Sequence, residues 1–208
     1  MNPFLYDEVA SWIPDNARVL DLGTGEGMFL ERLARERRAH VEGVERNPEL
    51  VGRCIERHLI VHQGDVLDGL DQYSKGSFSH VLLLGTLQEL VDPLTTLREA
   101  FRVGQRVIVA YSNFAYWRVR LQLLLDGRTP VTRALPAQWY RTSNMHFFSI
   151  LDFESFCDDI GARQIRTACF NPRGKVGWRA NLRADYALSL VEAIPGGDLE
   201  SYRERSAH

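Results

Sequence analysis

A chain of 208 residues is long enough for one α/β domain with a sizeable hydrophobic core. Its 25 lysines and arginines and 27 aspartates and glutamates give a net charge of −2, so no basic excess argues for nucleic-acid or membrane-surface binding. The sequence has no apolar run of the ~18 residues that span a membrane and no visible signal peptide, and its three cysteines are widely spaced. We therefore expect a cytoplasmic protein without a membrane or nucleic-acid partner.

Strand and helix patterns alternate along most of the chain, which is typical of a parallel sheet with helices on both faces. The expected helices cover Phe4–Ile13, Glu26–Arg37, a segment from Pro48 capped by Asn47, a segment from Asp92-Pro93, Tyr116–Leu125, and a segment that Ser149 caps and Gly161 ends. The expected strands cover Arg18–Leu22, a strand ending at Glu45, Leu59–His62, Phe78–Leu84, Arg106–Tyr111, Arg163–Phe170 and Val176–Ala184. We predict one domain over residues 1–208, with a doubly wound, mostly parallel sheet of seven strands and a frayed tail over residues 195–208.

The alternation breaks after the fifth expected strand, over an insertion at about residues 112–149. In Tyr116–Leu125 apolar and arginine positions interleave on a helical pattern, and prolines and aromatic residues follow. Long segments over the carboxyl edge of such a sheet often carry function. The insertion could form a lid, a substrate wall or a partner surface, and a plain helical cap over the core is an equally good interpretation.

The first expected strand runs directly into a loop with glycine at positions 23, 25 and 27. A glycine lets the backbone turn tightly and lets a ligand approach it closely, and a strand, a glycine turn and a helix N-terminus form a nucleotide-type binding corner. The dinucleotide fingerprint needs a small residue where this chain has Met28. The G-x-G-x-G pattern instead resembles motif I of class I S-adenosylmethionine (SAM) methyltransferases. We expect Gly23, Thr24 and Gly25 to contact the cofactor through their backbone, with Asp21 shaping the loop.

Two further acidic residues follow expected strands. Glu45 ends the second strand, 20 residues after Gly25, which is the spacing at which an acidic side chain meets ribose hydroxyls in such folds. A carboxylate can accept both hydrogen bonds of a cis-diol. Past the third strand, Asp65 could accept from the adenine amino group and the Val66 N–H could donate to the ring. The full set of predicted cofactor-binding residues is Asp21, Gly23, Thr24, Gly25, Glu45, Arg46, Asp65, Val66, Leu84 and Gly85.

The sequence says less about a reaction. Many amino-group methyltransferases have an Asn/Asp-Pro-Pro-aromatic turn after the fourth strand, where this chain has Leu84-Gly85-Thr86-Leu87. His146 is the best-placed candidate base, although a structural role is the more common one for such a histidine. The remaining histidines show no metal-ligand pairing, so no metal site is predicted.

Longer stretches of the sequence resemble the family of the methionine biosynthesis protein MetW. The stretches that carry the resemblance are Gly85–Gln88, Asn113–Pro136, Trp139-Tyr140 and Asn144–His146, and the likeness extends over roughly residues 4–190. Two positions depart from the family pattern, which usually has cysteine where Thr24 stands and proline where Ser143 stands. The resemblance implies a SAM-methyltransferase fold, a role in methionine biosynthesis, SAM or S-adenosylhomocysteine as ligand, and a partnership with a homoserine O-acyltransferase of the MetX type, an α/β-hydrolase.

Two functional hypotheses follow. In the first, the chain is a SAM-binding protein that supports or regulates the acyltransferase, and SAM acts as a signal of pathway output. In the second, it is a methyltransferase acting on a small molecule. An enzyme needs an open cavity beside the methyl group, whereas a regulator could have that cavity blocked. Nucleic-acid methylation is a poorer third hypothesis because the near-neutral charge suggests no basic groove.

Overall fold

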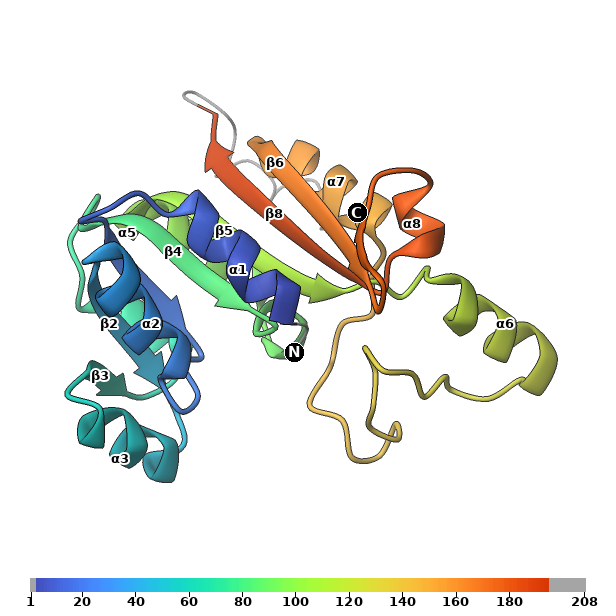
Figure 1. The fold of residues 1–208 in the computed structure, drawn as a ribbon, viewed down its shortest axis with the longest axis horizontal. Coiled ribbons are helices and arrows are strands. Elements are labelled where there is room, and N and C mark those ends of the chain that lie inside the picture. Colours follow the sequence, from blue (N-terminus) through green and yellow to red (C-terminus); the bar gives the residue numbers. More distant parts are fainter. Residues whose placement is uncertain (1–2, 195–208) are drawn as a thin grey trace, which may run out of the picture.

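The computed structural model describes residues 3–194, which form one sheet with helices on both faces (Figure 1). The strands are β1 (Arg18–Leu22), β2 (His40–Glu45), β3 (Ile60–Gln63), β4 (Phe78–Leu84), β5 (Gly104–Ser112), β6 (Ala162–Asn171), β7 (Gly174–Val176) and β8 (Tyr186–Ala193). Their order is β3-β2-β1-β4-β5-β8-β6-β7. The first five strands pair in parallel, and β8 pairs antiparallel with both β5 and β6. The predicted doubly wound, mostly parallel sheet is confirmed.

The helices cover two separate cores. They are α1 (Pro3–Trp12), α2 (Met28–Arg37), α3 (Pro48–Glu56), α4 (Val66–Asp71), α5 (Pro93–Val103), α6 (Trp117–Asp126), α7 (Ile150–Asp159) and α8 (Ala180–Arg183), with a 3₁₀ turn, η1, at Leu87–Glu89. Successive strand residues point to opposite faces, so Val19 packs with α1 and α2 while Leu20 packs with α4, α5 and α7. The chain therefore buries apolar side chains on both faces of the sheet, as a doubly wound fold requires.

Local sequence signals correctly predicted where two of the helices begin. The Asn47 side chain accepts a hydrogen bond from the Glu49 N–H, with Pro48 at the first helical position of α3. Ser149 and Asp152 form the predicted capping box of α7. Each of these caps involves residues at most three positions apart, which is why the sequence reveals them.

The last part of the predicted sheet was wrong in two respects. The sheet has eight strands, because the short β7 pairs with β6 at the edge. The stretch Val176–Ala184 is not a strand but contains α8, and the last long strand is β8. Since β8 lies between β5 and β6, Ala187–Val191 is buried throughout, and such a strand shows no polar–apolar alternation. The predicted frayed tail over residues 195–208 lies outside the described residues.

The segment after β5 leaves the sheet (Figure 1). Helix α6 projects away from the strands, and the chain then returns to α7 without forming another helix or strand. The Gln88 side chain fastens the base of this segment, accepting from the Ser112 N–H at 2.8 Å and donating to the Ser112 carbonyl at 3.1 Å. No helix of residues 3–194 is long and apolar enough to cross a membrane.

Candidate functional site

The glycine loop joins β1 to α2 at the point where the strand order reverses. Gly23 has φ +86°, and a Cβ there would lie 2.5 Å from Thr86 Oγ1, so both the backbone conformation and the packing require glycine. Gly25 has φ +61°, but no atom of the described residues lies within 4 Å of a Cβ built on it. The loop is thus packed tightly against the turn after β4 at Gly23 and is open at Gly25, where a ligand can approach the backbone.

The side chain of Glu45 is held against this loop. Its Oε2 accepts a hydrogen bond from the Gly25 N–H at 2.8 Å, and its Oε1 accepts from the Asn47 N–H at 2.9 Å. The residue is 8% exposed, so the carboxylate is well ordered and largely desolvated. A carboxylate has further lone pairs after these two bonds, which leaves it able to accept from hydroxyl groups of a ligand.

Asp21 and Thr24 lie at the start of the glycine loop and are hydrogen-bonded to each other. The Thr24 hydroxyl donates to the Asp21 carbonyl at 3.0 Å, and a Cβ at Gly43 would overlap this hydroxyl. The Asp21 carboxyl group is buried, and its Oδ1 has no hydrogen-bond partner among residues 3–194. Burial, and secondarily the negative charge of Glu45, raises the pKa of Asp21 to about 7. An unpartnered buried oxygen beside the glycine loop suits a polar ligand nearby, and the loop-shaping role of Asp21 stays a prediction.

A cavity of about 840 Å³ opens over the carboxyl ends of β1, β2 and β4. Seven of the ten predicted cofactor residues line it, namely Gly23, Glu45, Arg46, Asp65, Val66, Leu84 and Gly85. Asp65 also caps α4, because its Oδ1 accepts from the Leu67 N–H at 3.2 Å. The volume lies within the usual range for small-molecule sites, and apolar side chains such as Leu50, Leu90 and Met145 complete the wall.

Several lining residues were not predicted. Thr86 donates to the Leu22 carbonyl at 2.7 Å and ties the turn after β4 to the glycine loop, and its position directly after a buried strand was the available signal. Ser143 and Met145 come from the insertion and reach the cavity through the tertiary fold. Ser143 donates to Glu89 Oε1 at 2.6 Å. Met145 belongs to the stretch Asn144–His146 that carries the family resemblance, but no local pattern indicates that it or Ser143 reaches the cavity.

His146 lies outside this cavity wall. Its Nε2 is 2.9 Å from the Leu90 carbonyl oxygen, and its backbone N–H donates to the Gln88 carbonyl. The residue lines a separate cavity of about 400 Å³ formed mainly by apolar side chains, including Phe147 and Phe153. These contacts fasten the insertion to η1, so the placement favours a structural role for His146. In residues 3–194 no group of three or more His, Cys, Asp or Glu side chains could hold a metal ion.

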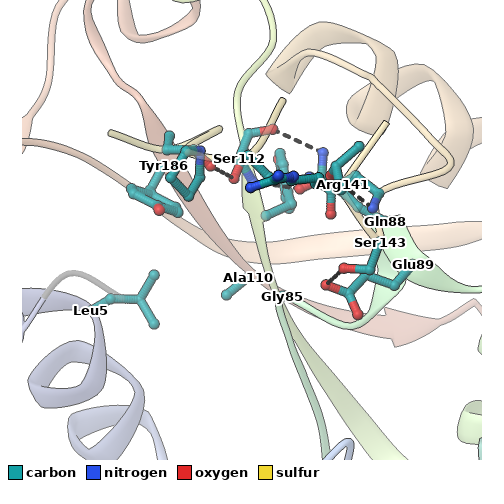
Figure 2. A pocket seen from close by; sticks show the side chains of 15 residues that line it. Leu5, Gly85, Gln88, Glu89, Ala110, Ser112, Arg141, Ser143 and Tyr186 are labelled. Atoms are coloured by element: carbon teal, nitrogen blue, oxygen red, sulfur yellow. Dashed lines mark hydrogen bonds between the residues drawn. The ribbon is translucent and has the colours of Figure 1, made fainter. Parts of the chain in front are cut away.

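A further cavity, of about 270 Å³, is shown in Figure 2 with the side chains that line it. It adjoins the 840 Å³ cavity, because the two share Gly85, Glu89 and Ser143. Figure 2 shows the hydrogen-bonded Glu89 and Ser143 at one end of the smaller cavity, and Tyr186 toward the other end. Space for a small molecule therefore exists next to the larger cavity.

Alanine substitutions can separate the structural use of the glycines from ligand binding. Gly23→Ala is expected to lower the free energy of unfolding by about 1–3 kcal/mol because its Cβ clashes with Thr86 at a positive φ. Gly25→Ala is expected to cost only about 1 kcal/mol, from its φ, yet to weaken SAM binding by filling the open space over the loop. Urea denaturation and calorimetric titration with SAM measure the two effects. The control is Gly52→Ala in α3, where a Cβ meets no described atom within 4 Å and φ is not positive. Wild-type SAM affinity in Gly25→Ala would show that this space is not used by the cofactor.

The strand order, the glycine loop at its reversal and the acidic residue ending β2 define the fold of class I SAM-dependent methyltransferases. Solved structures have the same fold. A SAM-dependent methyltransferase from Thermotoga maritima superposes with a TM-score of 0.64 at 16% identity, and the match covers 91% of this chain and 89% of that one. For a SAM-dependent methyltransferase from Archaeoglobus fulgidus the coverage is 90% and 94%, the TM-score 0.62 and the identity 15%. The [4+2]-cyclase SpnF matches with a TM-score of 0.65, at 17% identity, over 91% of this chain and 80% of its own. At these identities the likeness shows the fold alone, and the cyclase illustrates that the fold leaves the reaction open.

The sequence comparison is more specific. The family model for "Methionine biosynthesis protein MetW" matches residues 5–191, and the chain belongs to this family. A curated relative, the bifunctional methionine biosynthesis protein MetXA/MetW of Rhodopirellula baltica, is 30% identical over 155 residues, which are 70% of this chain. The chain spans 25% of the length of that relative. Family membership thus supports a MetW-like role in methionine biosynthesis.

Proposed function

We propose that this protein binds SAM in the 840 Å³ cavity and, as a SAM-binding subunit, supports a MetX-type homoserine O-acyltransferase in the cytoplasm. The observation that carries the SAM assignment is the pairing of the Glu45 carboxylate with the Gly25 N–H at the open point of the glycine loop. The observation that supports the partner is the relative whose name joins MetXA and MetW in one bifunctional protein.

The residues of the cavity suit the chemical groups of SAM. Glu45, which lines the cavity, would accept hydrogen bonds from the ribose hydroxyls, and the backbone of Gly23 and of the neighbouring Gly25 would contact the methionine part. Asp65 and Val66 stand on the wall on which the adenine would lie, between apolar side chains that suit a flat ring. SAM, when bound, would supply a methyl group on a sulfonium, and the protein's own contribution is to bind and orient it.

SAM is made from methionine, so a SAM site on a protein of this pathway can report the pathway's output. Ser143 and Met145 line the SAM cavity and belong to the insertion, which gives occupancy of the cavity a physical route to a surface segment. We expect SAM to change either the affinity for the acyltransferase or its turnover. A ligand can do this only if it binds the two states differently.

Acyl transfer to homoserine by the cognate acyltransferase, measured with and without this protein, tests the proposal. The expected result is a clear stimulation that depends on complex formation and changes with added SAM. Size-exclusion chromatography of the mixture provides the parallel binding measurement. Unchanged turnover together with the absence of a complex would reject the partner role, and SAM-independent stimulation would reject SAM as the signal.

The second candidate is methyl transfer to a small molecule, and a specific observation favours it. The 270 Å³ cavity shows that the space beside the shared residues Gly85, Glu89 and Ser143 is open rather than blocked. The wall contains Glu89 and Arg141, which can bind charged groups of a substrate. Production of S-adenosylhomocysteine from SAM in the presence of candidate amino acids would establish this activity, and its absence with all of them would leave the binding role.

A further inference from the structure

Several of the most exposed large apolar side chains of the described residues lie on the insertion. We call residues 113–141 the arm. Within it Leu124 is 80% exposed, Leu125 70% and Trp139 70%. Helix α6 buries Val119 and leaves Leu121 and these leucines in solvent. Large apolar side chains that gather on one projecting element mark an interaction surface rather than ordinary exposure.

The arm also contains a concavity of about 520 Å³. It lies where α6 ends, and its walls include Arg128, Val131, Trp139 and Tyr140. Trp139 and Tyr140 pack edge to face with a centroid separation of 5.6 Å, so their rings form a preformed wall. A hollow lined by aromatic residues and an arginine has the composition of a pocket that accepts an anchoring side chain from a partner protein.

Internal contacts hold the arm in one conformation. Tyr116, Val119 and Leu135 form a small apolar cluster of their own. The Ser112 hydroxyl donates to the Ala134 carbonyl at 2.9 Å, and the Phe114 N–H donates to the Phe148 carbonyl at 3.1 Å. A surface that is already ordered loses less conformational entropy on binding, which suits it to docking.

The charge of the arm indicates whether a second copy of this chain or a different protein suits this surface. The arm has five arginines, all exposed, and one acidic residue, Asp126, whereas the chain as a whole has a net charge of −2. Two copies of the arm facing each other would bring like charges together, which disfavours a symmetric dimer through this surface. The arm instead suits a protein with an acidic rim and an apolar side chain at its centre.

We propose that the arm is the docking surface for the MetX-type acyltransferase, with α6 and the Trp139–Tyr140 hollow contacting its surface. This inference rests on the proposed function, because it names the surface through which the partner is bound. Arg141 ends the arm and lines the 270 Å³ cavity, and Ser143 follows two residues later in the SAM cavity. Docking on the arm and occupancy of the two cavities therefore involve one continuous stretch of chain.

Matched double variants test the surface. Leu124→Lys with Leu125→Lys places two charges on α6. The control, Ile55→Lys with Ile60→Lys, places two charges on apolar residues of α3 and β3 that are 60% and 69% exposed. With the purified acyltransferase, the arm variant is expected to bind at least tenfold more weakly and to lose stimulation, while the control variant keeps both. Calorimetry with SAM should give wild-type affinity for both variants, which shows that they are folded. Trp139→Ala is expected to weaken the complex as well.

The outcomes separate this inference from the proposed function. If the wild-type protein and the acyltransferase form no complex, the proposed function fails and the inference fails with it. If the wild-type complex forms and the arm variant binds equally well, the inference alone is overturned. If the arm variant instead converts a dimer of this protein to a monomer without affecting the acyltransferase complex, the occupant is a second copy of the chain.

Discussion

A Glu45→Ala variant is expected to bind SAM about 1–3 kcal/mol more weakly than the wild-type protein, which corresponds to roughly 5- to 150-fold in affinity. The change removes the carboxylate that we propose accepts from the ribose hydroxyls. It also leaves the Gly25 and Asn47 N–H groups without the acceptors that lie 2.8 and 2.9 Å away in the structure. Since those groups position the glycine loop, the loss affects the loop as well as the ligand contact.

Isothermal titration calorimetry with SAM measures this effect, and two further variants interpret it. Glu45→Gln keeps the shape of the side chain but replaces one acceptor oxygen by a donor, so it is expected to fall between the wild type and Glu45→Ala. Glu49→Ala, at an exposed position in the first turn of α3, controls for the removal of a nearby negative charge. Wild-type affinity in Glu45→Ala would remove this residue from the cofactor site.

An Asp21→Asn variant is expected to be more stable than the wild type above pH 7, by about 1–4 kcal/mol. Burial raises the pKa of Asp21 from 3.8 to about 7, so between these values the folded protein binds a proton that the unfolded chain has released. Stability from this group is therefore fully present below about pH 4 and is lost as the pH rises through about 7. Asparagine is neutral at every pH and avoids the cost of a buried charge.

Urea denaturation at pH 5 and pH 8 measures the difference between the two proteins. The wild type should lose stability relative to Asp21→Asn between these two values. Asp71→Asn, at an exposed position at the end of α4, serves as the control for a change of surface charge. A constant difference between wild type and Asp21→Asn across this pH range would mean that the Asp21 carboxyl group is not preferentially protonated in the folded protein.

The two cavities and the arm together bear on the choice between binding and catalysis. The open 270 Å³ space beside the proposed SAM site supports the methyltransferase hypothesis, since a pure regulator does not need it. The arm favours a partner, because its leucines Leu121, Leu124 and Leu125 are exposed on α6 and do not line either cavity. Both features share the stretch around Ser143, so a partner bound to the arm could alter the smaller cavity.

The sequence by itself determined the elements whose cause is local. The tight turn at Gly23, the acidic residue ending β2 and the caps at Asn47 and Ser149 each depend on residues within a few positions. The parallel strands with apolar runs could be placed for the same reason, and the resemblance carried by the insertion supplied the family.

Only the tertiary structure decided the features that join distant segments. It placed β8 between β5 and β6, where burial on both faces removes the alternating pattern, and it brought Ser143 and Met145 from the insertion into the wall of the 840 Å³ cavity. It also turned His146 toward the Leu90 carbonyl and left the leucines of α6 in solvent, because contacts between segments far apart in the chain leave no periodic signal in the sequence.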